Sequence, residues 1–252
     1  MRKNINLLKL STSVFLILIL ASKLIAQQPL KYSFGLRFEP NINWLTIDNK
    51  RIQSNKINAD FNFGIFANKH INEKFYIGSG VNILNQTANI KANNVFVQNK
   101  FKGADSSIVN SFNIQYRLRY FEIPFILTMN TREMHNKTYY AEAGLSSAFL
   151  IRAKANIDAD GFKNIKNVSI QNPDDEDNYV IRDADNRNTS YNQEIFPVRF
   201  AGVIGAGAKF GVLINSYVTT GLRFNIGLNN VFKEERWQST NNFMSLNLGF
   251  VF

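Results

Sequence analysis

The chain has 252 residues, no cysteine and a formal net charge of +10 at pH 7. The lack of cysteine excludes disulfides, structural thiolate metal sites, a cysteine nucleophile and a lipid-modified N-terminal cysteine. The first 26 residues carry four basic side chains and no acid, so subtracting four from +10 leaves +6 for the rest. This modest basic excess gives no reason to expect nucleic acid as a partner.

The N-terminal segment has the features of a secretory signal peptide. Arg2, Lys3 and Lys9 precede an unbroken apolar run over 14–20, and small residues follow. We predict a signal peptide over 1–26, cleaved after Ala26, and a single domain over 27–252. The alternative, an uncleaved anchor, needs a longer apolar run to span roughly 30 Å of hydrocarbon. No other stretch could form a transmembrane helix, so the exported chain is either soluble or a membrane β-barrel.

Eight later stretches alternate apolar residues with polar or small ones, which is the period of a β-strand. In the first of them, Phe34, Leu36 and Phe38 fall on one face, with Arg37 and Glu39 on the other. The pattern predicts strands at 32–45, 57–69, 75–90, 111–129, 138–152, 197–211, 216–228 and 241–252.

The fourth stretch changes its apolar phase by one residue. Tyr120 belongs to the apolar face before the change, whereas Phe121 and Ile123 belong to it afterwards. A slip of one residue is typical of a β-bulge, and Pro124 fits a disrupted position in the ladder. We predict a β-bulge near Phe121, and the pattern leaves open which face Glu122 occupies.

The connections alternate in length. Those after the first, third, fifth and seventh stretches are long and polar, whereas the other three are short. An up-and-down barrel in an outer membrane has this asymmetry. We therefore predict an all-β fold, an eight-stranded antiparallel up-and-down transmembrane β-barrel closed by its first and last strands. The predicted location is the bacterial outer membrane, with both termini periplasmic and the long loops, chiefly 153–196, extracellular.

The final stretch, NNFMSLNLGFVF, has one apolar face and ends on an aromatic residue. It resembles the closing strand of an outer-membrane barrel. That resemblance implies that Phe250 and Phe252 form an insertion signal read by the barrel-insertion machinery. The expected partners are therefore this machinery and the lipid bilayer.

The polar faces of the strands carry charges of both signs, with bases in excess. If the apolar faces meet lipid, the predicted interior charge network consists of Arg37, Glu39, Asp60, Arg117, Arg119, Glu122, Glu142, Arg152, Arg199, Lys209 and Arg223. An eight-stranded interior is just wide enough to be filled by side chains, which favours a solid network of ion pairs. The alternative is an anion-conducting pore.

Three other groups of residues could carry chemistry. The acidic run at 172–178 offers oxygen ligands for calcium, but it lacks the alternating spacing and central glycine of a calcium loop. His70 and His135 lie on separate predicted turns. Ser146 and Ser147 follow a glycine but sit inside a strand, without the turn of a GxSxG nucleophile. The sequence therefore predicts no catalytic residue, no cofactor and no metal site.

Two adjoining stretches, YFEIPFILTMNT and YYAEAGLSSAFLIRAKA, resemble the PorT-like family of outer-membrane β-barrel proteins of Bacteroidota-type bacteria. The matching positions are Tyr120, Glu122, Ile123 and Pro124, followed by Gly144, Phe149 and Arg152. The opening YSFGLRFEPNINWL, the late GLRFNIGLNN and the final VF also look like that family, so the resemblance spans nearly all of the predicted mature chain. It implies the fold and the outer-membrane location, and only a few members of the family are tied to type IX protein secretion.

The sequence leaves three functions open. The leading hypothesis is a non-enzymatic structural or accessory barrel whose long loops contact other envelope or secretion proteins. The second is a narrow pore for small solutes. The third is a soluble lipocalin-like periplasmic binding protein, in which the apolar faces point inward to a ligand.

Overall fold

The structure is a computed structural model that describes residues 32–48, 52–54, 56–92, 95–99, 106–109, 112–159, 165–171, 178–182, 191–213, 216–233 and 238–252. The predicted signal peptide and positions 172–177 of the acidic run lie outside these residues. Within the described ranges, no helix is of sufficient length and hydropathy to cross a membrane.

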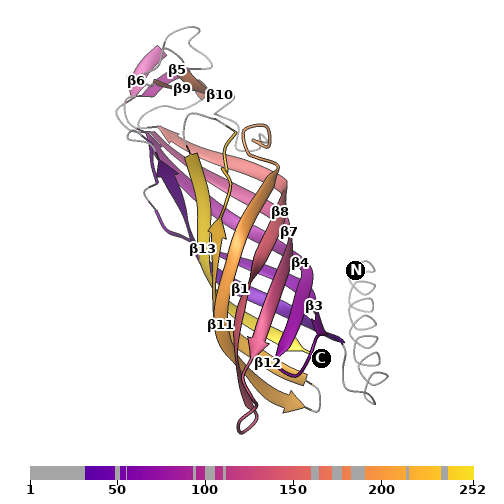
Figure 1. The fold of residues 1–252 in the computed structure, drawn as a ribbon. Coiled ribbons are helices and arrows are strands. Elements are labelled where there is room, and N and C mark those ends of the chain that lie inside the picture. Colours follow the sequence, from indigo (N-terminus) through magenta and orange to yellow (C-terminus); the bar gives the residue numbers. More distant parts are fainter. Residues whose placement is uncertain are drawn as a thin grey trace, which may run out of the picture.

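Eight long strands close into an antiparallel β-barrel (Figure 1). They are β1 (Tyr32–Asp48), β3 (Asn58–His70), β4 (Phe75–Ala92), β7 (Phe112–Asn130), β8 (Lys137–Ala159), β11 (Val198–Leu213), β12 (Ser216–Gly227) and β13 (Gln238–Val251). Around the barrel the order is β4, β3, β1, β13, β12, β11, β8 and β7, and β4 pairs with β7 to close the ring. The first and last barrel strands pair, so the predicted eight-stranded up-and-down barrel is confirmed.

The two ends of the barrel differ in their connections. Short turns join β3 to β4, β7 to β8 and β11 to β12 at one end, which we call the turn end. The start of β1 meets the C-terminus there, because the Phe34 amide donates to the Phe252 carbonyl oxygen at 3.1 Å and the Phe252 amide donates back at 2.9 Å. The longer connections leave from the opposite end, which we call the loop end. The predicted alternation of short and long connections is therefore present.

A belt of large apolar side chains covers the outside of the barrel in its turn-end half. On β7 it includes Ile123, Phe125 and Leu127, which are 42%, 61% and 46% exposed and face away from the interior. The other strands contribute Phe34, Leu36, Phe38, Phe61, Phe63, Ile65, Leu145, Phe149, Ile151, Phe200, Ile204, Leu222, Phe224, Ile226, Leu246, Leu248 and Phe250. A lipocalin-like binder needs these apolar faces turned inward, so the belt contradicts that hypothesis.

Polarity is reversed in the loop-end half of β1, β4, β7 and β8, which we call the collar. Along β7, every second residue from Ile114 to Thr128 is buried toward the interior. Within the belt these inward residues include the polar Glu122, whereas in the collar they include Leu118 and Tyr120. The outward residues change in the opposite sense. Inside and outside therefore exchange polarity along one continuous strand.

This reversal explains the phase change at Phe121 without a bulge in β7. That strand pairs with β4 in one register, from Met129 opposite Phe75 to Phe112 opposite Ala92. The directions of the side chains do not slip, and Glu122 faces inward. What changes is which face of the strand carries apolar residues. The sequence pattern that predicted a β-bulge in β7 therefore reflects the passage of a regular strand from the belt into the collar.

A register shift does occur next to this point, in the neighbouring strand. Arg119 of β7 pairs with Arg152 of β8, but the next residue, Tyr120, pairs with Leu150. Ile151 is thus the extra residue of a bulge in β8. A bulge of this kind changes the direction of the side chains that follow it, because the bulged strand has one residue more than its partner over the same length.

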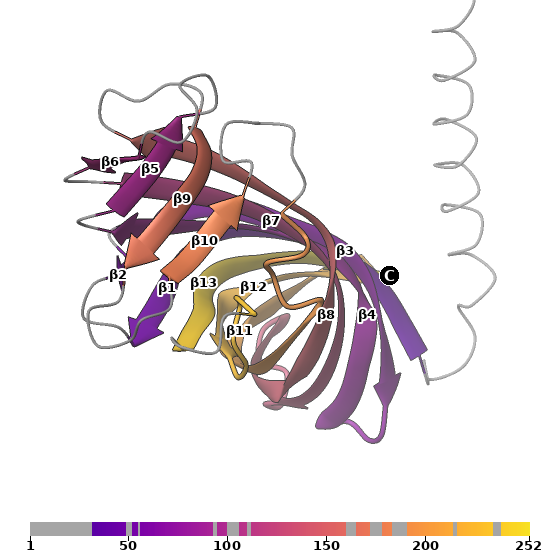
Figure 2. The same ribbon diagram turned by 90° about the horizontal axis from the view of Figure 1, so that it is seen from above.

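Four shorter strands form a second antiparallel sheet beyond the loop end (Figure 1, Figure 2). Their order in the sheet is β10 (Asn178–Arg182), β9 (Ile165–Gln171), β5 (Val95–Asn99) and β6 (Ser106–Val109), and a two-residue strand, β2 (Ile52–Gln53), pairs with β4. The sequence predicted irregular connections at 91–110 and 153–196, and these contain all four strands. Such short segments offer little alternation to recognise.

Candidate functional site

The interior of the belt holds a network of four charged side chains. Arg223 donates from Nη1 to Glu39 Oε1 at 2.7 Å and from Nε to Glu142 Oε1 at 2.6 Å. Arg37 Nε lies 3.7 Å from Glu39 Oε1. Two arginines and two carboxylates therefore share the centre of the barrel, and their formal charges cancel.

The network crosses the lumen of the barrel. Glu39 lies on β1, Arg223 on β12 and Glu142 on β8, and each of these strands is separated from the next by one intervening strand. Arg223 is 3% exposed, so its charge is held away from solvent. Breaking a buried pair is costly because the remaining ion is left uncompensated. The two hydrogen-bonded carboxylates are what make burial of this arginine tolerable.

Polar side chains continue the filling of the barrel toward the collar. Glu122 Oε2 accepts a hydrogen bond from Asn82 Nδ2 at 2.7 Å. Arg199 Nη2 donates to Asn225 Oδ1 at 2.7 Å and to the Asn241 carbonyl oxygen at 2.8 Å. Each of these two charged groups is thus held by partners in the barrel wall. The interior is a packed layer rather than a lining around open space.

Toward the turn end, Lys209 is surrounded by tyrosine rings. Its Nζ lies 4.2 Å from the ring centroid of Tyr76, 5.3 Å from that of Tyr217 and 5.6 Å from that of Tyr140. An ammonium group at such distances is attracted to the ring faces. The cavity between this cage and the ionic network has a volume of about 30 Å³, which is room for one or two water molecules. Outside the cage, at the turn end, an open cavity of about 620 Å³ begins.

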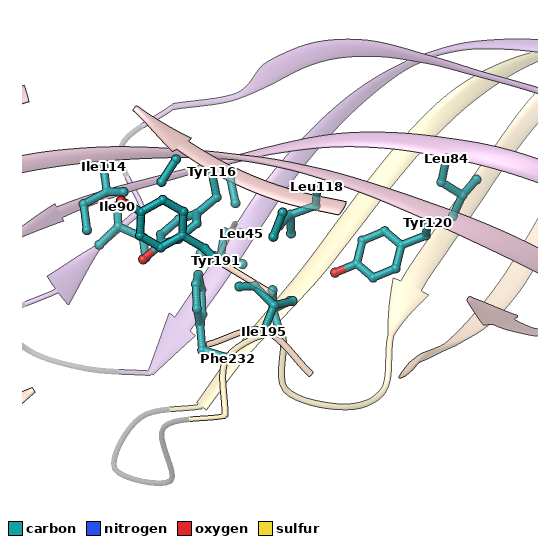
Figure 3. Close-up of a cluster of buried hydrophobic side chains, with 14 of the residues drawn as sticks. Leu45, Leu84, Ile90, Ile114, Tyr116, Leu118, Tyr120, Tyr191, Ile195 and Phe232 are labelled. Carbon is teal, nitrogen blue, oxygen red and sulfur yellow. The ribbon is translucent and has the colours of Figure 1, made fainter. Parts of the chain in front are cut away.

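The collar is closed by a hydrophobic core (Figure 3). Tyr191 and Ile195 come from the segment before β11, and Phe232 comes from the segment after β12. Ile195 and Phe232 form an isolated β-bridge, and the Tyr116 ring centroid lies 5.0 Å from that of Phe232 and 6.1 Å from that of Tyr191. Two loop segments therefore fold back into the mouth of the barrel. They fill it with apolar side chains that are at most 2% exposed.

The structure separates the charged residues that the sequence assigned to the interior. On the inward side of their strands lie Arg37, Glu39, Asp60, Glu122, Glu142, Arg199, Lys209 and Arg223. Arg117, Arg119 and Arg152 are instead exposed on the outer face of the collar. We predicted that polar residues face inward along the whole strand, but this holds only within the belt and not in the collar. For Arg152, the bulge at Ile151 adds a second reason.

Polar side chains at the edge of β3 make a further contribution, pairing with backbone amides, that was not predicted from the sequence. The backbone pairing of β3 with β4 ends at Ile83. Beyond it, Asn62 Oδ1 accepts from the Asn85 amide at 3.0 Å, and Asp60 Oδ2 accepts from the Thr87 amide at 2.7 Å. Side chains thus replace carbonyl groups as partners for the β4 backbone. The available signal was the run of Asn and Asp at every second position.

The histidines and serines considered from the sequence lie apart from the network. His70 Nε2 is 3.2 Å from Ser33 Oγ, and Asn68 Nδ2 donates to the same oxygen at 3.3 Å. Of the two serines considered, Ser146 is 2% exposed on the inward face of β8 and Ser147 is half-buried on its opposite face, both inside the strand. His135 lies in the exposed turn after β7. Among the described residues, no three His, Asp or Glu side chains are grouped so that they could hold a metal ion.

Several solved outer-membrane barrels are similar to this chain. Neisserial surface protein A matches at 11% identity and a TM-score of 0.40, over 86% of this chain and 95% of that one. The outer membrane protein OprG of Pseudomonas aeruginosa matches at 9% identity and a TM-score of 0.41, over 87% and 95%. The attachment invasion locus protein Ail of Yersinia pestis matches at 10% identity and a TM-score of 0.37, over 88% and 100%. Similarities this distant transfer no function.

The family assignment comes from a different comparison. No curated protein matches the sequence. The family model described as the outer membrane protein beta-barrel domain matches residues 25–233, which is most of the chain. The protein therefore belongs to the outer membrane β-barrel domain family.

Proposed function

We propose that this protein is a non-conducting, non-enzymatic barrel of the outer membrane that serves as a structural or accessory component for other envelope proteins. The observation that carries the proposal is the double closure of the barrel. The ionic network fills the belt, and the hydrophobic core around Tyr116 and Phe232 fills the collar. A solute would have to displace a buried, balanced charge network and an apolar core in turn. Neither the ionic network nor the collar core resembles the water-filled interior of a porin.

Planar bilayer recordings on the purified protein test this proposal. The unaltered protein should insert and give no steady conductance. The Phe232→Ala variant should also give none, because the ionic network remains in place below the collar. Steady single-channel steps in the unaltered protein that change with Arg223→Gln would establish the narrow-pore alternative instead.

We propose the usual orientation of such barrels, with both termini and the short turns in the periplasm and the collar outside the cell. It is supported by the position of the chain ends, because Phe34 and Phe252 meet at the turn end. A protease added to intact cells should then cut only in loop-end connections. Cleavage in the turn that contains His135 would reverse the orientation.

Contact with a secretion apparatus is the finer form of the proposal. Its support is the resemblance of the strands at 120–152 to the PorT-like family, together with a second sheet, β10-β9-β5-β6, held beyond the loop end where partners can reach it. The secreted proteome of a deletion strain is the direct test. Retention of proteins with C-terminal sorting domains in the periplasm would support a role in type IX secretion, and unchanged secretion would remove that role.

A further inference from the structure

Four cationic side chains lie together on the outer face of the collar. Arg117 and Arg119 come from β7, Arg152 and Lys154 come from β8, and these two strands are neighbours (Figure 1). The register sets Arg117 opposite Lys154 and Arg119 opposite Arg152. Side chains directly opposite one another are about 5 Å apart, and the next pair on the same face is about 7 Å along the strand. We call these four residues the basic patch.

The bulge in β8 is what assembles the basic patch. If Ile151 were paired with Arg119 instead of bulging out, the register of the belt would continue, and Arg152 would face Leu118 while Lys154 faced Tyr116. Leu118 and Tyr116 point into the collar core and are at most 2% exposed. The bulge instead turns both cations outward, opposite two arginines. It therefore gathers four positive charges where a regular strand would leave two.

The cations of the basic patch are not neutralised by ion pairs. Among the described residues, none of the four forms an ion pair. Asp60 lines the same groove as the four cations, but its carboxylate is held by other partners: it accepts from the Thr87 amide at 2.7 Å and from Asn43 Nδ2 at 2.8 Å. Like charges directly opposite one another destabilise a sheet. An arrangement that costs stability and has no ion-pair partner among the described residues is suited to an external anion.

A groove beside the patch offers room for such an anion. It has a volume of about 490 Å³ and is lined by all four cations, by the carboxylate residue Asp60, and by Asn85, Gln86 and Thr87 of β4. Arg119 Nε donates to Asn85 Oδ1 at 3.0 Å, which holds that guanidinium at the groove. Arginine binds phosphate oxygens through parallel N–H groups, and lysine binds them as a point charge.

The position of the patch indicates the source of the anion. On β7 the outward residues are Phe125, Ile123 and Phe121, and the next one is Arg119. On β8 the outward side chains of the belt end at Ile151, directly before the cation. The cations thus begin where the apolar belt stops. A lipid whose acyl chains lie against the belt would have its headgroup at this level, whereas a free anion has no reason to prefer it.

We propose that the basic patch binds the phosphorylated headgroup of an outer-leaflet lipid, with the acyl chains packed along the outward aromatic and aliphatic side chains of β7 and β8. This inference rests on the proposed function, because it requires the belt to lie in the outer membrane with the collar outside. It assigns the β8 bulge a role in ligand binding. It also gives one sector of the barrel wall a fixed lipid neighbour.

Native mass spectrometry of the protein released from nanodiscs tests the proposal. The nanodiscs contain phosphatidylcholine with a small fraction of diphosphoryl lipid A. The test variant is Arg119→Gln with Arg152→Gln, which removes one facing pair. The matched control is Lys69→Gln with Lys74→Gln, which removes two exposed cations at the turn end. Heat-modifiable migration on gels confirms that each variant is folded and inserted.

The unaltered protein and the turn-end control should retain lipid A, and the patch variant should retain at least about tenfold less, as expected for loss of two charge-assisted contacts. Equal retention by the patch variant would overturn the proposal. So would displacement of lipid A by millimolar inorganic phosphate, since the site would then be one for free anions. Failure of the unaltered protein to insert would instead contradict the proposed function itself.

Discussion

The belt and the collar are built from the same strands by opposite rules. In the belt, Phe125 faces outward and Glu122 inward, whereas in the collar Arg119 faces outward and Tyr116 inward. The solvent outside each half explains the difference. A barrel wall in lipid must expose apolar side chains and can fill its narrow lumen with paired polar groups. The same wall in water buries apolar side chains in the ordinary way. The reversal therefore marks the edge of the membrane on the chain itself.

The largest expected effect comes from removing Arg223, the arginine that bridges the two carboxylates of the belt. Arg223→Met leaves Glu142 buried without its ion-pair partner and Glu39 with only the more distant Arg37, and should lower the free energy of unfolding by about 3–5 kcal/mol. Guanidinium-induced unfolding in lipid vesicles measures the loss. Arg132→Met, in the exposed turn after β7, is the control and should change little. If Arg223→Met left the free energy of unfolding nearly unchanged, the ionic network would not stabilise the belt.

A comparable change in the collar should act locally. Phe232→Ala removes a fully buried ring from the collar core and should cost about 3–4 kcal/mol there. Hydrogen exchange should speed up at the Val231 amide, which donates to the Ser239 carbonyl oxygen at 2.8 Å, while amides in the belt part of β12 stay protected. Equal deprotection of the belt would mean that the two halves unfold as one body.

A charge placed on the outer face sharpens the comparison, because the two halves should respond differently. Leu222→Arg puts a cation on the lipid-facing side of the belt and should cost about 2–4 kcal/mol. Thr46→Arg puts the same side chain on the exposed outer face of the collar and should cost almost nothing. Unfolding titrations of the two variants in the same vesicles supply the measurement. Similar costs at both positions would remove the distinction between lipid and water outside the wall.

The smallest expected effect has the opposite sign. Arg152→Gln relieves repulsion with Arg119 and should stabilise the protein by about 0.5 kcal/mol in a neutral detergent. Raising the salt concentration should shrink the gain, since exposed charges are screened. Thermal unfolding at low and high salt checks both statements. A loss of stability would mean that the side chain of Arg152 makes a packing contribution larger than the repulsion.

The sequence was sufficient for the architecture and for part of the interior. Alternation predicts strands because lipid and core impose a period of two, and the lengths of the connections predict the pairing of neighbours. That reasoning also selected the residues of the belt network, Arg37, Glu39, Glu142 and Arg223, because charges opposite an apolar face have only the lumen to occupy.

The rest could not be obtained because alternation reports which face is apolar and not which face is inside. On the collar side of Phe121 the apolar face is the inner face, so Arg117 and Arg119 were assigned to the wrong side of the barrel wall. The bulge at Ile151 leaves no compositional mark, since an aliphatic residue is ordinary in either register. The closing of the collar by Tyr191 and Phe232 depends on contacts between segments distant in sequence, and no local pattern encodes them.

Site-directed spin labelling along β7 tests the reversal most directly, and the lack of native cysteine makes single-cysteine variants simple to obtain. Labels from position 113 to position 129 are probed with oxygen, which partitions into lipid, and with a water-soluble nickel complex. Odd positions from 121 to 129 should be accessible to oxygen, positions 117 and 119 to the nickel complex, and even positions throughout to neither. Accessibility of even positions from 114 to 120 to either reagent would show that the strand slips, and would contradict the account.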